Sequence, residues 1–250
     1  RLAGLKPAKI KELEQGVRII KSLLAGEEVE FGAARPAKLP FPQNVPVWLA
    51  AGGPKTLEMA GSCADGVFIR VGTDIKNIEI SVNRIKEGAI KSGRDPNKVK
   101  LGTVFHTVFC EDEDDAMLMG KSMAAGYYEY SPVLVDNLNI SWNGPHPDEL
   151  KEQGLVWPDF HHAANLIESG KAVDFIPESL AKAFCLMGGV NQVANQITEV
   201  LKKCNDIGIE FEYVVLHPIP NPPIPDNGPN AYLEKIPREV LSQVKKNLAN

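Results

Sequence analysis

The sequence lacks the cysteine pairs, the long apolar runs and the basic excess that mark several classes of protein. Its four cysteines are widely spaced and include no CxxC pair, so we expect no disulfide framework, no zinc ribbon and a reducing, cytoplasmic environment. No apolar run approaches the roughly 18–20 residues of a membrane helix, so no membrane partner is expected. Asp and Glu number 32 against 27 Lys and Arg, a net charge of −5. This balance argues against a nucleic-acid partner.

Length and composition are those of an ordinary globular chain. The 250 residues are 44% hydrophobic and 24% charged, which argues against a disordered or fibrous protein. Because no internal repeat and no linker divides the chain, we predict a single domain over residues 1–250, with an insertion at 127–176 and a tail with a final helix at 217–250. The sequence begins with Arg1 rather than Met, and its first residues do not form a signal peptide, so we expect that a segment precedes it.

Apolar residues follow two kinds of spacing along the chain. In residues 7–24 they recur every three or four positions, as on one face of a helix, whereas 45–51 is a nearly continuous apolar run, typical of a strand buried on both faces. The other predicted strands are 66–70, 101–110 and 209–216, and the other predicted helices are 54–60, 74–91, 116–126, 191–205 and one beginning at Pro237. This alternation indicates parallel strands joined by helical crossovers. Residues 127–176 and 217–229 are expected to be irregular, the latter because it holds six prolines.

The most informative segment runs from a strand through two glycines to a proline at a helix start. Gly52 and Gly53 let a ligand approach the backbone closely. The helix that Pro54 opens presents free N–H groups and a partial positive charge at its N-terminus. Thr56 adds a hydroxyl and Lys55 a cation. We therefore predict a cradle for one phosphate, with a tight turn that binds nothing as the alternative.

Three further residues carry candidate chemistry. Arg70 and Gly72 follow a predicted strand at its carboxyl end, where proteins with parallel strands bind their ligands, so they are candidates for binding an anionic group of a substrate or cofactor. For Arg70 we favour the alternative, a surface charge paired with an acidic neighbour. His106 lies within the strand 101–110 and is a candidate catalytic proton donor or hydrogen-bond partner, although we favour a core histidine.

Two groups in the predicted insertion invite a functional interpretation that we do not favour. Adjacent side chains on a helix point in different directions, and no Glu or Cys completes a zinc spacing around His161 and His162. We therefore expect these two residues at a helix start and no metal site. We expect Tyr128, Trp157 and Phe160 to form a small core of the insertion rather than the lining of a substrate pocket.

A longer stretch is recognisable as a family pattern. Residues 50–61, followed by 64–67, resemble the luciferase-like monooxygenase superfamily, which includes FMN-dependent monooxygenases and reductases and dehydrogenases that use the deazaflavin coenzyme F-420. Other segments agree with this resemblance, namely 19–29, 186–193 and 211–216. Residues 159–163 and 173–177 look like the F-420-dependent branch, near methylenetetrahydromethanopterin reductase.

The resemblance implies the fold of a (β/α)8 TIM barrel of the luciferase-like type. The predicted strands would be strands five to eight of that barrel, and the first strands would be missing, which leaves a half-barrel with an insertion. From the alternation alone, an open doubly wound sheet is the other arrangement to consider, but its GxGxxG fingerprint is absent.

The resemblance also implies a site and an activity. Gly52 and Gly53 would contact the ribityl-phosphate part of the cofactor through backbone N–H groups, with Lys55 and Thr56 as weaker candidates. The implied reaction is hydride transfer between coenzyme F-420 and a small organic substrate, with the catalytic acid or base in the absent N-terminal part. One alternative is an FMN-dependent monooxygenase. Another is a non-catalytic half-barrel that pairs with another chain through its open sheet edges. A homodimer is the partner arrangement that we keep as an alternative.

Overall fold

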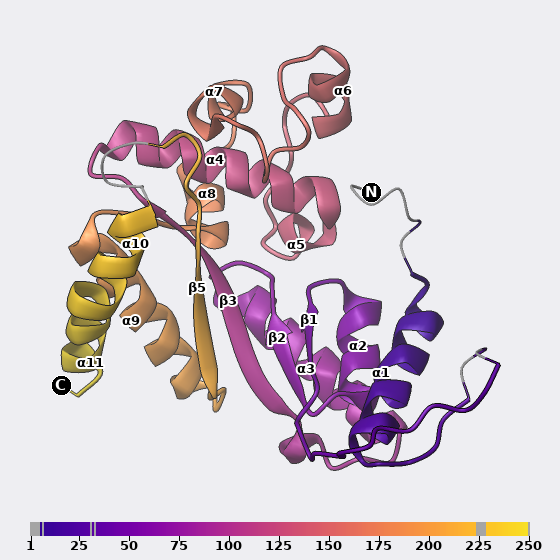
Figure 1. Cartoon of the computed structure of the whole chain (residues 1–250). Coiled ribbons are helices and arrows are strands. Elements are labelled where there is room, and N and C mark those ends of the chain that lie inside the picture. The colour runs from indigo at the N-terminus through magenta and orange to yellow at the C-terminus, as the bar shows by residue number, and fades with distance from the viewer. Residues whose placement is uncertain (1–5, 7, 31, 33, 224–228, 250) are drawn as a thin grey trace. The chain divides into compact units, whose positions relative to one another are not determined.

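The computed structural model describes residues 6, 8–30, 32, 34–223 and 229–249; the expected helix start at residue 7 lies outside them. The chain divides into two compact units. The first comprises the described residues up to Ile69, Ser81–Thr103 and Phe211–Tyr213. The second comprises Arg70–Ile80, Val104–Glu210 and the described residues from Val214 onward. Strand β3 (Lys100–Phe109) continues from the first unit into the second (Figure 1).

The first unit is built on parallel strands. Its elements are α1 (Ile10–Leu24), β1 (Trp48–Ala51), α2 (Pro54–Cys63), β2 (Gly66–Ile69), most of α3 (Ile75–Lys91), a 3-10 turn (Pro96–Lys98) and the start of β3. β1 pairs with β2 from Trp48↔Gly66 onward, and β2 pairs with β3 from Gly66↔Lys100 onward. Because both pairings are parallel, the carboxyl ends of β1 and β2 lie at the same edge.

Aromatic rings pack over the strands of the first unit. The Trp48 ring centroid lies 4.8 Å from that of Phe68 and 5.3 Å from that of Tyr213. A Cβ on Gly66 would lie 2.3 Å from the Trp48 ring, and a Cβ on Gly102 would lie 2.7 Å from the Phe68 ring. Glycine at these two strand positions therefore makes room for the rings.

Helices α2 and α3 touch backbone to backbone at two glycines. A Cβ on Gly61 would lie 2.0 Å from the carbonyl oxygen of Ile85, and a Cβ on Gly88 would lie 1.8 Å from that of Glu58. Arg94 adds to this contact, because its guanidinium donates to two carbonyl oxygens at the end of α2, at 2.6 and 2.7 Å. Neither glycine position has space for a side chain.

The second unit contains the rest of β3, two further strands that pair with it, and helices. Its elements are α4 (Glu113–Tyr130), α5 (Val133–Asp136), α6 (Pro147–Glu152), α7 (Leu166–Lys171), α8 (Glu178–Phe184), β4 (Leu186–Gly188), α9 (Val190–Asp206), β5 (Tyr213–Pro218), α10 (Pro229–Lys235), a π-helical turn (Ile236–Val240) and α11 (Leu241–Ala249). β4 pairs parallel with β3 from Thr107↔Leu186 to Phe109↔Gly188, and β5 also pairs with β3. α4 packs against both α7 and α8 (Figure 1).

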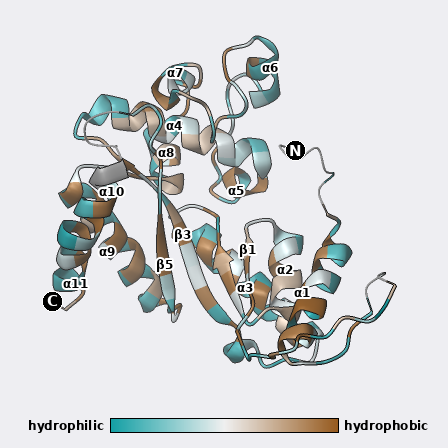
Figure 2. Ribbon diagram, in the orientation of Figure 1, coloured by the Kyte–Doolittle hydropathy of each residue, from teal (hydrophilic) through white to brown (hydrophobic). Residues whose placement is uncertain are grey.

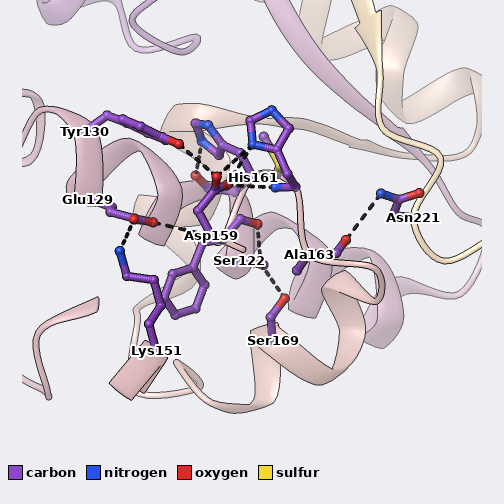
Figure 3. Close-up of polar contacts among 12 residues, drawn as sticks. Ser122, Glu129, Tyr130, Lys151, Asp159, His161, Ala163, Ser169 and Asn221 are labelled. Carbon is purple, nitrogen blue, oxygen red and sulfur yellow. Dashed lines mark hydrogen bonds and ion pairs between the residues drawn. The ribbon is translucent and has the colours of Figure 1, made fainter. Parts of the chain in front are cut away.

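The contact between α4 and α7 is polar at its centre. The hydroxyl of Ser122 lies 2.7 Å from that of Ser169 and donates to the carbonyl oxygen of Phe160 at 3.0 Å (Figure 3). A Cβ on Gly170 would lie 2.1 Å from the carbonyl oxygen of Leu118. The two helices therefore approach as closely as α2 and α3 do, and both serine hydroxyls are satisfied although they are buried.

The predicted alternation of parallel strands and helices is confirmed, but several predicted bounds are wrong. The segment 127–176, expected to be irregular, contains the end of α4 and all of α5, α6 and α7. Asn165 shows why, since its side chain accepts hydrogen bonds from two backbone N–H groups and starts α7 among turn-forming residues. The strand expected at 209–216 begins only at Tyr213. β4 and α8 are absent from the prediction because these elements are too short for their apolar residues to show a helical or strand periodicity.

Burial also differs from the expected pattern. β1 is shorter than predicted and is not buried on both faces, since Ala50 is exposed and the strand ends the order β1-β2-β3-β4. In α1, Val17 is buried, but Ile10, Leu13 and Ile20 are 36%, 37% and 49% exposed, and Figure 2 shows hydrophobic residues along this helix. Across the described residues, no helix is both long and apolar enough to cross a membrane.

We expect Gly61→Ala to lower the free energy of unfolding by about 1–3 kcal/mol, because the added methyl group forces α2 and α3 apart. Gly16→Ala is the matched control, since a Cβ there meets nothing within 4 Å and alanine is the better helix former by about 0.5–1 kcal/mol. Urea unfolding of both variants measures the difference. Equal stability of Gly61→Ala and the wild type would contradict the close contact.

Candidate functional site

The turn between β1 and α2 presents backbone donors. Gly53 is the N-cap of α2, with φ −81° and ψ 147°, and Pro54 occupies the first turn. In this described segment no side chain caps the helix, and the first turn has no acidic residue. The backbone N–H groups of Lys55 and Thr56 therefore point out of the helix end, where the helix dipole is positive.

Space is open above this turn. The nearest heavy atom to a Cβ built on Gly53 is the Thr56 hydroxyl oxygen, at 3.9 Å. The start of α9 offers a contrast, because a Cβ on its N-cap, Gly189, would lie 2.3 Å from a carboxylate oxygen of Glu111. The chain's own carboxylate covers the start of α9, whereas the start of α2 has room for an external anion. The residues present thus fit a phosphate group.

Asp65 anchors the strand that leads into this turn. Its carboxylate accepts hydrogen bonds from the Val47 N–H at 2.9 Å and from the Lys21 ammonium at 2.5 Å. Burial works to raise the pKa of Asp65, but the hydrogen bonds from Lys21 and Val47 outweigh it and lower that pKa. The start of β1 is therefore tied to the end of α2 and to α1, on the elements that flank the glycine turn.

A second group of predicted residues lies in the second unit. Arg70 directly follows β2, and its guanidinium Nη2 lies 3.5 Å from Nε2 of His106. His106 is 2% exposed, and its Nδ1 lies 3.0 Å from the hydroxyl of Tyr127. The His106 ring centroid lies 5.3 Å from that of His161 and 5.0 Å from that of His217. The structure thus brings together Arg70 and His106, two of the predicted site residues.

The histidines of this group are held neutral. Burial, with smaller contributions from His161, His217 and Arg70, lowers the pKa of His106 to about 2. Burial likewise lowers the pKa of His161 to about 4. Burial also raises the pKa of the Tyr127 hydroxyl. Arg70 is therefore the charged member of the group at neutral pH, since a guanidinium does not deprotonate in proteins.

Gly72 has a structural role next to this group. Its φ is +86°, and a Cβ there would lie 2.4 Å from the carbonyl oxygen of Ala183. That same oxygen accepts hydrogen bonds from the N–H groups of Thr73 and Asp74, at 2.8 and 3.2 Å. Glycine at this position fastens the loop after Arg70 to the end of α8, and its predicted contact with an anion stays a prediction.

His161 and His162 engage different partners. The His161 ring donates to the carbonyl oxygen of Met123 at 3.0 Å, whereas His162 contacts the carboxylate of Asp159, which also accepts from the Tyr130 hydroxyl (Figure 3). Both histidines lie in a turn, so the expected helix start is wrong. The described part of the chain holds no group of three His, Cys, Asp or Glu that could bind a metal ion.

The aromatic residues of the insertion divide into two kinds. Phe160 is fully buried, and Tyr128 stacks on Trp142 with 4.2 Å between ring centroids. Phe160 is thus a core residue as predicted, whereas Tyr128 is half-buried and pairs with another ring of the insertion. Trp157 does not belong to the predicted small core, because it is 82% exposed.

A pocket of about 720 Å³ lies in the second unit, and its lining begins at Thr73, directly after Gly72. It is bordered by the loop before α3 and by α4, α8 and α9. Its charged lining is mostly self-paired, as in the ion pairs Lys182–Glu178 and Lys203–Glu199, at 2.9 and 2.6 Å. We do not place the functional site there, because its lining includes neither the glycine turn nor the histidine group.

Tyr127 and His217 are site neighbours that the sequence did not reveal. The predicted helix ends at 126 and the predicted strand ends at 216, one residue before each of them. The signal in the sequence that could have identified them is that each carries a ring and lies next to the end of a predicted helix or strand. The residues of the glycine turn belong to the first unit and those of the histidine group to the second.

Comparison with known proteins gives a consistent family. The family model described as luciferase-like monooxygenase matches residues 6–204. A 5,10-methylenetetrahydromethanopterin reductase from Methanolobus tindarius is 37% identical over 206 residues, covering 78% of this chain and 57% of the relative. The reductase of the same name from Archaeoglobus fulgidus is 30% identical over 198 residues, covering 77% and 57%. The chain therefore spans little more than half the length of these relatives.

Solved structures show the same fold. The coenzyme F-420 dependent tetrahydromethanopterin reductase from Methanopyrus kandleri matches with a TM-score of 0.66 and 24% identity, over 96% of this chain and 65% of that one. An F-420-dependent secondary alcohol dehydrogenase matches with a TM-score of 0.55 and 15% identity, over 96% and 64%. A long-chain alkane monooxygenase matches with a TM-score of 0.52 and 14% identity, over 98% and 59%.

We expect the free energy of unfolding to fall as the pH drops from about 6.5 to 4.5. In the unfolded chain His106 and His161 take up protons near pH 6.5, whereas in the folded chain their pKa values are about 2 and about 4. The unfolded chain therefore binds more protons in this window, and acid favours unfolding by up to about 1.4 kcal/mol per pH unit for each group.

Urea unfolding across this pH range measures the slope, and two neighbouring variants assign it. His161→Gln keeps a donor for the Met123 carbonyl but removes one titrating group, so its slope is expected to be shallower than that of the wild type. His162→Gln changes the neighbouring, exposed ring and is the control for the substitution itself. An unchanged slope in His161→Gln would contradict the buried neutral histidine.

Proposed function

The chain belongs to the luciferase-like monooxygenase family, and on this premise we propose that it is an oxidoreductase that transfers a hydride between coenzyme F-420 and a small organic substrate. Two curated relatives that are 37% and 30% identical are named 5,10-methylenetetrahydromethanopterin reductases. That one-carbon carrier is therefore the first substrate to test. Because the chain spans 57% of these relatives, the proposal concerns the activity to which this part of the protein contributes.

The observation that carries the proposal is the open turn at the start of α2. An external phosphate there would accept hydrogen bonds from the backbone N–H groups of Lys55 and Thr56, and the Thr56 hydroxyl and the Lys55 ammonium are within the same turn. Gly53 leaves the approach free. The nearest heavy atom to a Cβ built there, outside its chain neighbours, is the Thr56 hydroxyl oxygen, at 3.9 Å.

In this proposal the cofactor and the chain have different roles. When bound, the deazaflavin supplies the hydride chemistry, as cofactors do in such enzymes. The chain's own residues bind the phosphate at one end and so fix the position of the rest of the molecule. Asp65 and Lys21 contribute indirectly, because their hydrogen bonds hold β1 and α2 and hence the turn.

A second candidate is an FMN-dependent monooxygenase. The long-chain alkane monooxygenase with a TM-score of 0.52 and the description of the family model favour it. A deazaflavin lacks the ring nitrogen needed for easy oxygen activation, so substrate-dependent oxygen consumption distinguishes this candidate from hydride transfer by F-420.

We expect F-420 to bind this chain saturably and more tightly than FMN in titrations followed by fluorescence. Gly53→Ala is expected to weaken F-420 binding by about tenfold or more, because a methyl group displaces the phosphate from charge-assisted hydrogen bonds. Its stability is expected to fall by no more than about 1 kcal/mol, the cost of alanine at an N-cap, since a φ of −81° suits any residue and the space is open.

Gly16→Ala in α1 is the control for the glycine change and is expected to bind F-420 as the wild type does. Tighter binding of FMN than of F-420 would favour the monooxygenase. Binding of neither, or equal F-420 binding by Gly53→Ala, would overturn the assignment of the cradle.

A further inference from the structure

We propose that Arg70 and His217, supported by His106, form a second binding site, for the oxyanion group of a small molecule. The chemical class is a carboxylate or a phosphate. The inference rests on the proposed function only in taking this oxyanion to belong to a molecule that takes part in the reaction. Its residues lie in the second unit and share no member with the turn at Gly53.

The first support is the charge of Arg70. Other arginines are engaged by the chain itself: Arg18 pairs with Glu14, Arg84 pairs with Glu87, and Arg94 donates to backbone carbonyls. Among the described residues, no carboxylate forms an ion pair with Arg70, which is exposed and whose one side-chain hydrogen-bond contact is with the His106 ring. Its guanidinium carries five N–H donors in a planar fork. Most of these donors therefore face solvent and have no partner in the chain.

The second support is the way His106 positions that guanidinium. A guanidinium only donates hydrogen bonds, so Nε2 of His106 is the acceptor in the contact with Arg70, and Nδ1 then carries the proton that points to the Tyr127 hydroxyl. His106 lies on β3 and Tyr127 on α4, both buried. Two rigid elements thus orient Arg70, and His106 acts as a positioning residue.

The third support is the neutrality of the surrounding rings. Burial and then Arg70 lower the pKa of His217, and burial keeps His161 uncharged. The His217 ring lies against that of His106, with 5.0 Å between ring centroids, and His106 contacts Arg70. A neutral His217 imidazole therefore offers an N–H donor near the guanidinium without repelling it. An oxyanion bound between Arg70 and His217 would accept charge-assisted hydrogen bonds from one and a neutral hydrogen bond from the other.

An acidic group that acts on His161 is already engaged by other residues. Asp159 acts on the pKa of His161, but its carboxylate accepts hydrogen bonds from Tyr130 and contacts the His162 ring at 2.8 Å (Figure 3). It therefore does not neutralise Arg70. Arg70 follows the carboxyl end of β2, and His217 lies one residue before the end of β5. The carboxyl ends of parallel strands are where barrel proteins bind their ligands.

The test is an NMR titration of the histidine rings with inorganic phosphate and, separately, with glutarate. We expect at least one probe to shift the His217 ring signals saturably, and to raise the pKa of His217, because a bound anion opposes the charge of Arg70. His217→Gln assigns the signals. Arg70→Gln is expected to weaken the probe's binding by about tenfold or more.

Two controls separate this site from other causes. Arg84→Gln removes an exposed arginine on α3 that is paired with Glu87 and is expected to bind the probe as the wild type does. Gly53→Ala is expected to leave the His217 shift unchanged, so failure of the F-420 cradle and failure of this site are distinguishable. The signals of His146, which caps α6, report whether Arg70→Gln stays folded.

Each outcome decides the proposal. Binding of phosphate alone would identify a phosphoryl group as the ligand, binding of glutarate alone would identify a carboxylate, and binding of both would leave the site selective for oxyanions in general; all three support it. No saturable shift with either probe would overturn it. Equal affinity in Arg70→Gln and the wild type would overturn it as well.

Discussion

Strand β3 is the constraint on which the rest of the structure depends, because every pairing between the described strands other than β1–β2 uses it. Buried main-chain N–H and C=O groups need partners inside the protein, and β3 supplies them to β2, β4 and β5. Thr107 shows how far this reaches. Its carbonyl oxygen accepts from the Ile219 N–H at 3.0 Å and from the Tyr232 hydroxyl at 2.9 Å. The chain after β5 is therefore held by the same strand.

Burial on β3 also determines the chemistry of His106. A buried imidazole loses the hydration of its charged form and stays neutral. A neutral ring has one donor and one acceptor nitrogen, so it can link the Tyr127 hydroxyl to the Arg70 guanidinium without adding charge. The histidine that we favoured as a core residue is thus a core residue in fact, and its contact with Arg70 gives it a second role within the proposed oxyanion site.

The family and the fold give these two groups their context. The predicted (β/α)8 barrel class of the luciferase-like type is confirmed by the matching family model, the solved neighbours and the parallel pairings. In our proposal, the turn at Gly53 binds an anion through backbone N–H groups, which any sequence can supply if its helix start is left open. The group around Arg70 instead depends on side chains. We therefore expect ligand binding at the turn to be sensitive to an added side chain, and ligand binding at Arg70 to be sensitive to loss of the positive charge.

The order of most helices and strands, the family and the glycine turn were predictable because each depends on residues close together in the chain. The partners of His106 were not, since Tyr127 and His217 lie 21 and 111 positions further along and no spacing connects them. The same holds for Gly61 and Gly88, whose backbone contacts become visible only when α2 and α3 are packed. The sequence by itself therefore determined most of the longer local elements and the glycine turn. Only the tertiary structure decided which side chains meet, because packing brings distant residues together and local periodicity carries no record of it.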